Sequence, residues 1–399
     1  MIENKRILPV IVISQFLCTS LWFAGNAVLP DLVKSTDPGT GFLAHLTSAV
    51  QFGFIIGTLI FATLSISDRF SPSRVFFTCS LLAALTNMSI TVEGVDSPGV
   101  LFLRFLTGFF LAGIYPVGMK IAADYFEKGL GRSLGFLVGA LVLGTAFPYL
   151  LKTLTVGLPW KYVLLVTSAL SATGGIAVLL LVPDGPYRRR GGRMNLAGFA
   201  EVLKNTNFRS AAFGYFGHMW ELYAFWAFLP IMLEAYNFNL KAEINVPLLS
   251  FLIIASGGIA CVLSGVLSTY FGAKRIATLS LMLSCLCCLL SPIFLFISSS
   301  FVFLSFLFSW GLVVVADSPL FSTLVARNAP EQSRGTSLTM VNCIGFSITI
   351  VSIQLLNLLS ANLNSRYLYV ILAIGPLFGL VSLIGKDESA SVVPMKFQK

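Results

Sequence analysis

The chain has 399 residues, of which 56% are hydrophobic and only 11% are charged. Soluble globular proteins carry about 25% charged residues, so this composition excludes a water-soluble protein. The formal net charge of +9 would by itself allow an acidic partner such as nucleic acid. The positions of the basic residues, however, indicate membrane topology instead.

Apolar runs long enough to cross a bilayer follow one another along the chain. The first, from Ile7 to Leu29, contains no charged residue, and a bilayer span needs about 20 apolar residues. It is too long for the apolar region of a signal peptide, so we expect it to be retained. Barrel strands would be about half as long, which predicts helices. The twelve predicted spans are 7–29, 42–66, 75–92, 98–122, 132–155, 161–182, 209–233, 244–268, 275–297, 301–325, 334–358 and 366–385.

A long polar connection divides these spans into six and six. It runs from Pro183 to Phe208 and is basic and rich in turn residues, whereas the other connections are short. We therefore predict an all-α polytopic membrane protein with a six-helix bundle in each half. The predicted parts are an N-terminal bundle (1–183), a cytoplasmic linker (184–208), a C-terminal bundle (209–386) and a cytoplasmic tail (387–399).

The basic residues also predict an orientation. With the N-terminus in the cytoplasm, 20 of the 26 Lys and Arg residues fall on the cytoplasmic side, five fall on the other side, and Arg104 lies within a span. The positive-inside rule then places both termini in the cytoplasm of a cell inner or plasma membrane. Topology or contact with anionic lipid explains "RRR" at 188–190 better than nucleic-acid binding does.

The residues that usually mark enzymes and ATP-driven pumps are missing from the sequence. All seven cysteines lie in apolar runs, where Cys is typically a small buried hydrophobe. "CLCC" (285–288) lacks the spacing of a metal site, and His45 and His218 are the only histidines. There is neither an H-E-x-x-H motif nor a phosphate-binding G-x-x-x-x-G-K-[ST] motif. We expect no enzyme activity, no cofactor and no metal.

Two loops at corresponding places in the halves are related. "LSISDRFSPSR" (64–74) and "GVLSTYFGAKR" (265–275) each join the second and third spans of a half, and Asp68 and Thr269 are 201 positions apart. Tyr115–Pro116 and Ser318–Pro319 are 203 positions apart, in the fourth and tenth spans. Two matches in order at nearly one period predict duplicated six-helix halves, one architecture of secondary transporters.

These motifs resemble those of a known family. The two loops resemble the G-x-L-x-D-R-x-G-R-K signature of the major facilitator superfamily, and "RFLTG" (104–108) resembles its R-x-x-x-G signature. The resemblance implies two bundles around a central cavity and transport by alternating access. The antiporter signature of the fifth helix is poorly matched by "GFLVGALVLGTAFP" (135–148), which disfavours drug–proton exchange. The nitrate branch has an arginine in the second and eighth helices, where this chain offers Gln51 and no arginine.

The charges of the two loops are candidates for a gate on the cytoplasmic side. Asp68 is expected to face the N-terminus of the eleventh span, where the helix dipole is positive. Arg69 or Arg74 is expected to pair with Asp124. Such contacts would form in one arrangement of the halves and break in the other, favouring the outward-open state. The second loop contributes Lys274 and Arg275; the alternative for all these charges is a purely topological role.

Charged residues inside the spans are candidates for substrate and proton sites, because such residues usually face a cavity or a partner. Arg104 is expected to pair with a substrate carboxylate or a protein acid, with structural anchoring as the alternative. Glu221 and Asp317 are candidates for the proton site, Glu221 first, with a fixed ion pair as the alternative. Asp317 is also placed to cap a helix break. His218 is either a proton relay or a structural imidazole.

Uncharged polar and aromatic residues complete the predicted cavity. Gln15, Cys18, Trp22 and Asn26 recur at helical spacing on one face of the first span. Tyr115 shares a face of the fourth span with Arg104, and Gln51 lies in the second span. Trp22, Trp220, Trp226 and Tyr223 are either pocket-lining or packing residues.

The sequence thus predicts a secondary transporter that moves a small polar or anionic organic solute by proton-coupled alternating access. Import is slightly favoured by the weak antiporter motif. The alternatives are a proton antiporter that exports amphipathic compounds or drugs, and a non-transporting membrane sensor. We expect a monomer whose partners are its small-molecule substrate, protons and membrane lipids, with no nucleic acid.

Overall fold

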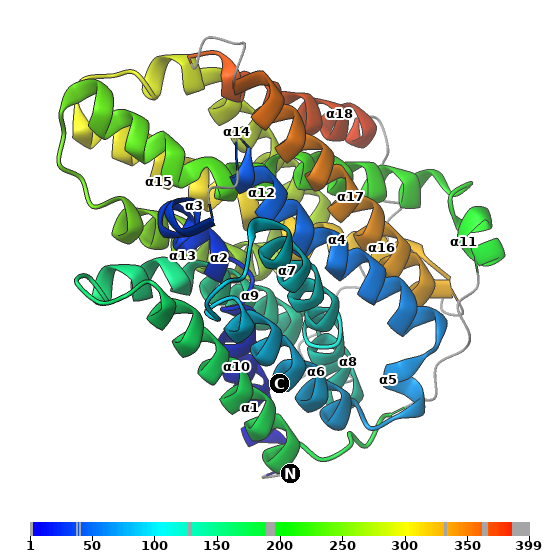
Figure 1. The fold of residues 1–399 in the computed structure, drawn as a ribbon. Helices are drawn as coiled ribbons and strands as arrows, with labels where there is room; N and C mark the ends of the chain where they lie inside the picture. Colours follow the sequence, from blue (N-terminus) through cyan, green and yellow to red (C-terminus); the bar gives the residue numbers. More distant parts are fainter. Residues whose placement is uncertain are drawn as a thin grey trace.

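The computed structural model describes residues 3–36, 39, 41–126, 130–188, 196–330, 333–360 and 366–384. These residues are almost entirely helical and contain no β-strand. Their helices form twelve consecutive spans, six on each side of the linker, so the predicted all-α fold with two six-helix halves is confirmed (Figure 1). The predicted tail (387–399) lies outside the described residues.

The first half comprises six spans, of which the first and fourth are each built from more than one helix. Chain direction alternates from span to span, so the N-terminus and the linker lie on one side, called here the linker side. The helices are α1 (Glu3–Thr19), α2 (Ala24–Ala27), α3 (Leu29–Thr36), α4 (Phe42–Thr63), α5 (Ile66–Arg69), α6 (Pro72–Ser89), α7 (Ser97–Leu111), α8 (Tyr115–Tyr125), α9 (Leu130–Leu154) and α10 (Lys161–Leu181).

The second half repeats this arrangement after the short linker helix α11 (Leu196–Val202). Its first span is one helix of 35 residues that continues through Pro230. The helices are α12 (Thr206–Leu240), α13 (Val246–Phe271), α14 (Ala273–Phe294), α15 (Ser300–Ala316), α16 (Ser318–Asn328), α17 (Arg334–Ser360), the 3₁₀-helix η2 (Leu368–Ala373) and α18 (Ile374–Leu383).

The fourth and tenth spans break at corresponding places. α8 begins at Tyr115 and α16 begins at Ser318, and each has a proline in its first turn. Proline has no backbone N–H and is tolerated where a helix begins, since those N–H groups have no partner within the helix. The motif found twice in the sequence therefore marks the same backbone interruption in both halves, which supports the duplication.

Close helix packing fixes each half internally. Gly108 of α7 faces Val50 of α4, and a Cβ atom at Gly108 would lie 1.9 Å from the Val50 carbonyl oxygen. Any larger residue would push the two helices apart, which explains the glycine of the "RFLTG" motif. The close contact sets α7 firmly against α4 and so positions Arg104, one turn earlier on α7.

The two halves meet along α4 with α17 and along α9 with α13. Thr349 of α17 donates to Gln51 Oε1 at 2.8 Å, and Gln354 donates to Ser48 Oγ at 2.9 Å. Ser48 lies in the half of α4 that is farther from the linker side. These contacts therefore hold the halves together in the middle of the bundle and toward the side opposite the linker.

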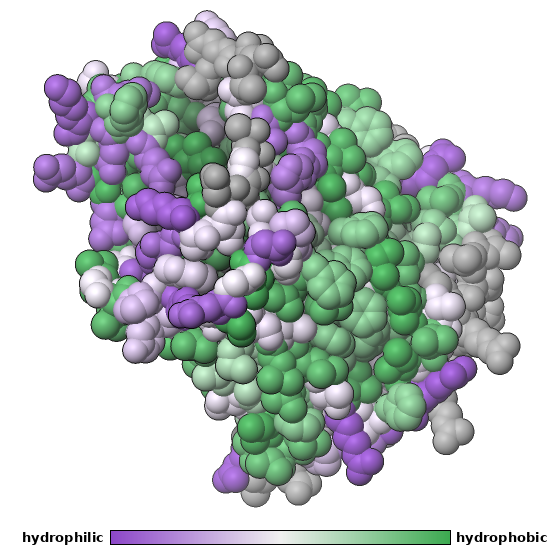
Figure 2. Space-filling model, in the orientation of Figure 1, coloured by the Kyte–Doolittle hydropathy of each residue, from purple (hydrophilic) through white to green (hydrophobic). Residues whose placement is uncertain are grey.

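The surface and the helix lengths fit a membrane. Among the described residues, eight helices are long and apolar enough to cross a bilayer, and two shorter apolar helices (Arg6–Thr19 and Leu368–Leu383) belong to the first and twelfth spans. A broad hydrophobic band crosses the face drawn in Figure 2, with hydrophilic residues gathered on either side of it. Many large apolar side chains are exposed on the surface of the protein, among them Phe102 (60% exposed).

Candidate functional site

Arg104 stabilises a break in the first span. α1 ends at Thr19 and α2 begins at Ala24, and the backbone between them is held by turn hydrogen bonds, of which the one to Leu21 O is long (3.4 Å, from Ala24 N). The Arg104 side chain is fully buried, and it donates from Nη1 to Leu21 O at 3.0 Å and from Nη2 to Trp22 O. Lipid offers no hydrogen-bond donor, so a break at this depth needs such a donor from the protein.

A second contact ties Arg104 to the third span. Nη1 also donates to Asn87 Oδ1 at 3.1 Å, and the Asn87 amide donates to Leu164 O and to Thr167 Oγ1 on α10. The prediction that Arg104 pairs with an acid of the protein is therefore wrong, because its terminal nitrogens donate to carbonyl and amide oxygens instead. Its position supports the alternative of structural anchoring, since both terminal nitrogens are already engaged inside one half.

Glu221 is held in a comparable way inside the second half. Its carboxylate is 1% exposed and accepts three hydrogen bonds: from Trp310 Nε1 (2.6 Å), Ser284 Oγ (2.9 Å) and Cys288 Sγ (3.2 Å). An ion pair of Glu221 with Arg104 is thus not formed. The three donors come from α14 and α15, and no periodicity within α12 could have revealed them.

His218 and Asp317 form a different kind of pair. His218 Nδ1 lies 2.8 Å from Asp317 Oδ1, and both side chains are 1% exposed. Asp317 stands at the break between α15 and α16, but its side chain makes no capping hydrogen bond, so the predicted cap is wrong. Within the described part of the chain, Asp317 Oδ2 and His218 Nε2 are buried without a hydrogen-bond partner. This pair, unlike Glu221, keeps unused donor or acceptor atoms.

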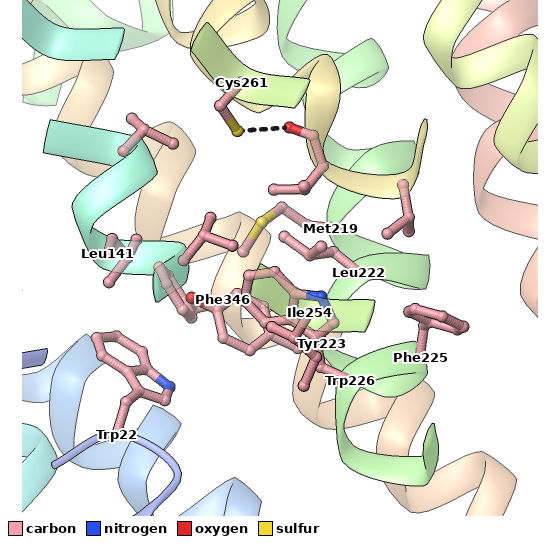
Figure 3. Close-up of a cluster of buried hydrophobic side chains, with 14 of the residues drawn as sticks. Trp22, Leu141, Met219, Leu222, Tyr223, Phe225, Trp226, Ile254, Cys261 and Phe346 are labelled. Atoms are coloured by element: carbon pink, nitrogen blue, oxygen red, sulfur yellow. Dashed lines mark hydrogen bonds between the residues drawn. The ribbon is translucent and has the colours of Figure 1, made fainter. Parts of the chain in front are cut away.

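Aromatic side chains from both halves meet beside the break in the first span. Trp22 lies 5.9 Å from Tyr223 of α12 and 5.6 Å from Phe346 of α17, measured between ring centroids. Tyr223 in turn contacts Trp226 at 5.3 Å. Figure 3 shows Trp22 facing this group across the gap between the ribbons of the two halves. The indole N–H groups of Trp22 and Trp226 are buried, and neither has a hydrogen-bond partner among the residues that the structure describes.

Trp220 does not join this aromatic group. Its Nε1 donates to Ile371 O of η2 at 3.2 Å, so it acts as a packing residue. Phe346 was not among the predicted residues. It could not be recognised from the sequence, because the chain contains 35 phenylalanines. Only the tertiary structure shows which of them lies beside Trp22.

The polar stripe predicted on the first span does not form one face. Cys18 donates to Ser171 O on α10, and Asn26 donates to Thr47 Oγ1 on α4 at 2.7 Å. Trp22 points into the aromatic group instead. Helical spacing across positions 15–26 fails because the helix is interrupted after Thr19. The prediction of a single face is therefore wrong.

Three predicted cavity residues remain near the middle of the bundle. Gln15 is fully buried beside Gly118 of α8, and both polar atoms of its side chain lack a hydrogen-bond partner among the described residues. Gln51 joins the halves through Thr349, while its Nε2 is unpaired. Tyr115 is partly buried at the start of α8 and packs against the main core. Unpaired buried amides of this kind are available to a polar ligand.

The first loop forms an ion-pair network within its own half. Lys120 Nζ lies 2.9 Å from Asp68 Oδ1 and 3.5 Å from Asp124 Oδ1. The expected pairing of Asp124 with Arg69 or Arg74 is therefore wrong. Lys120 was missed, although its spacing of four residues from Asp124 on one helix was a usable signal. A contact of Asp68 with the eleventh span stays a prediction for the alternative arrangement of the halves.

The second loop is built differently from the first. Its chain passes from α13 to α14 through Gly272 alone, with φ of 89°, whereas the first loop contains the extra helix α5. Lys274 and Arg275 consequently lie in the first turn of α14, and Arg275 is exposed. The sequence likeness between the loops therefore does not extend to their local structure.

Comparison with known proteins agrees with this architecture. The family model of the Major Facilitator Superfamily matches residues 11–353. The MFS-type transporter pytF of Aspergillus terreus (strain NIH 2624 / FGSC A1156) is 24% identical over 222 residues, which are 54% of this chain and 71% of that protein. The crystal structure of the human organic anion transporter MFSD10 (TETRAN) matches with a TM-score of 0.76 and 14% identity, over 95% of this chain and 99% of the other. The chain thus belongs to the major facilitator superfamily.

Proposed function

We propose that the chain is a proton-coupled secondary transporter that moves a small amphipathic organic molecule, neutral or cationic, by alternating access. Membership of the superfamily supports a secondary transporter. The observation that carries the substrate class is the aromatic group of Trp22, Tyr223, Trp226 and Phe346 at the junction of the halves. Flat aromatic faces bind apolar and cationic groups, the latter through the ring quadrupole.

The charges inside the bundle agree with this substrate class. Arg104, the residue predicted to bind a substrate carboxylate, donates instead to backbone carbonyl groups. Lys120 is engaged by Asp68 and Asp124 near the linker side. His218, Asp317 and Glu221 remain, and together they favour a cation or a neutral molecule over an anion. The predicted alternative was an exporter of amphipathic compounds, and the site supports the substrate class of that alternative better than it supports an anionic solute.

The contacts between the halves support alternating access. Gln354 with Ser48 and Thr349 with Gln51 join α17 to α4 in the middle and on the side opposite the linker. We propose that this is the inward-facing arrangement, and that these contacts separate when the protein opens outward. Proton coupling is assigned to the pair of His218 and Asp317, because the pair is buried and keeps unused polar atoms.

The orientation in an inner or plasma membrane, with both termini in the cytoplasm, is proposed from the basic residues and is directly testable. Cysteines placed singly at exposed positions 34, 241 and 204 should differ in their reactivity toward a membrane-impermeant maleimide. Positions 34 and 241 should react in intact cells, and position 204 only after permeabilisation. Equal reactivity of positions 34 and 204 in intact cells would contradict the orientation.

The aromatic group should determine which compounds bind. In a thermal-unfolding screen of size-matched aromatic ammonium compounds, alcohols and sulfonates, we expect the ammonium compounds and alcohols to raise the melting temperature and the sulfonates to leave it unchanged. Trp22→Ala should weaken binding of the best compound about 10-fold or more, since a desolvated cation–π contact contributes about 2 kcal/mol. Trp22→Phe should retain most of the binding.

Phe102→Ala is the matched control, because it removes an aromatic ring from the lipid-facing surface. It should leave binding unchanged. Stabilisation by sulfonates alone would overturn the proposed substrate class and return the protein to the anionic solutes first predicted. Unaltered binding in Trp22→Ala would place the site elsewhere.

A further inference from the structure

A cavity lies at the linker side of the first half. It measures ≈ 500 Å³ and lies between the loop after α4, the start of α6 and the end of α10. Its polar lining residues are Arg69, Ser71, Ser73, Arg74, Asp184 and Arg188. All of them belong to the first half or the adjoining start of the linker, so the cavity is separate from the junction of the halves.

The cavity is strongly basic. Three arginines face a single carboxylate, and that carboxylate, Asp184, already pairs with Arg188 and accepts a hydrogen bond from Ser71 Oγ at 2.6 Å. Among the described residues, Arg69 and Arg74 are therefore left without a carboxylate partner, and both are exposed. Guanidinium groups present planar sets of donors that match phosphate oxygens.

The N-terminus of α6 adds to the positive electrostatic potential of the cavity, most of which comes from the arginines. Ser71 precedes the helix but its side chain makes no capping hydrogen bond, since its hydroxyl donates to Asp184. Ser73 and Arg74, in the first turn, line the cavity. The unpaired N–H groups of a helix start and the helix dipole both favour an anion at this position.

The flank of the cavity is apolar and exposed. Leu179 lines the cavity at the end of α10, and next to it Leu180 and Leu181 are 73% and 57% exposed. Phe70, between the arginine Arg69 and Ser71, is 61% exposed. A ligand with a negatively charged head and apolar chains would match both parts, with its head among the arginines and its chains along α10.

We propose that this cavity is a binding site for a phosphate-bearing anion, supplied by the headgroup of an anionic phospholipid in the linker-side leaflet. Arg188, which lines the cavity, donates from Nη2 to Asp68 O and Phe70 O, two carbonyl groups of the loop that carries Asp68. A headgroup bound in the cavity is therefore connected to this loop through Arg188. Occupancy therefore stabilises the loop and, through Asp68 and Lys120, the attachment of α8. The site does not depend on the proposed transport activity.

The test compares the melting temperature of the full-length protein in phosphatidylcholine nanodiscs with and without phosphatidylglycerol. We expect phosphatidylglycerol to raise the melting temperature of the wild type. Arg69→Gln/Arg74→Gln should lower the apparent affinity for phosphatidylglycerol about 30-fold, since each basic side chain at an anionic surface contributes to binding. Arg69→Lys/Arg74→Lys should retain much of the response.

Arg209→Gln/Arg327→Gln is the matched control, because it removes two exposed charges from the linker side outside the cavity. It should respond as the wild type does. An equal loss in the control, or no response in the wild type, would overturn the site. Should the double glutamine variant fail to fold, each single variant is expected to lose part of the response, and an undiminished response in both would also overturn it.

Soluble glycerol 3-phosphate, added to phosphatidylcholine nanodiscs, separates the two sources of phosphate. We expect it to leave the melting temperature unchanged, because it lacks the chains that contact α10. Stabilisation by glycerol 3-phosphate that disappears in Arg69→Gln/Arg74→Gln would support the phosphate site and overturn the lipid as its source.

Discussion

Asp317→Asn is expected to abolish uphill accumulation of substrate while exchange of internal for external substrate continues. The amide keeps the shape of the side chain but can neither take up nor release a proton. In the wild type, Asp317 lies 2.8 Å from His218 Nδ1 in a buried position, and its Oδ2 has no partner. The measurement is uptake into proteoliposomes of a compound found by the stabilisation screen, with and without a pH gradient.

Glu221→Gln is the comparison for this experiment. Glu221 accepts hydrogen bonds from three donors, so it serves as a fixed acceptor within one half. The amide nitrogen of glutamine would face hydrogen-bond donors, so the variant should unfold at a lower temperature. Its transport of substrate should remain coupled to the proton gradient. Normal accumulation in Asp317→Asn would refute the assignment. If Glu221→Gln alone abolished accumulation and preserved exchange, the proton site would be Glu221, as the sequence first suggested.

Arg104→Met is expected to destabilise the protein rather than to impair substrate binding selectively. The substitution leaves Trp22 O and Asn87 Oδ1 without a donor, and Leu21 O keeps only the long hydrogen bond from Ala24 N (3.4 Å). Each buried polar group left unsatisfied costs about 1–3 kcal/mol, so the two groups predict a loss of about 2–6 kcal/mol and a poor yield of folded protein. Thermal unfolding in detergent measures this loss.

Arg104→Lys should be intermediate, because one ammonium group cannot reproduce the spread of the guanidinium donors. Arg209→Gln, on the exposed surface, should have little effect on the melting temperature. A folded, thermally normal Arg104→Met protein that no longer bound its ligand would restore Arg104 as a substrate-binding residue.

Hydropathy and short motifs were sufficient to predict the helices and their duplication. Each span needs about 20 apolar residues, and this requirement is local, so runs such as 42–66 and 161–182 could be read directly from the chain. Proline acts on its own backbone, so the break at Pro319 was expected from the sequence, and Pro116, noted only as the matching part of the repeat, lies at the corresponding break. Both predictions depend on residues that are close together in the sequence.

The partners of the buried charges were decided only by the tertiary structure. Arg104 binds the carbonyl groups of Leu21 and Trp22, more than 80 positions away, and Glu221 binds Trp310, 89 positions away. The first span looked like one continuous helix, so its polar residues appeared to share a face. A charge buried in lipid must find partners, but which atoms supply them depends on how helices distant in sequence pack together.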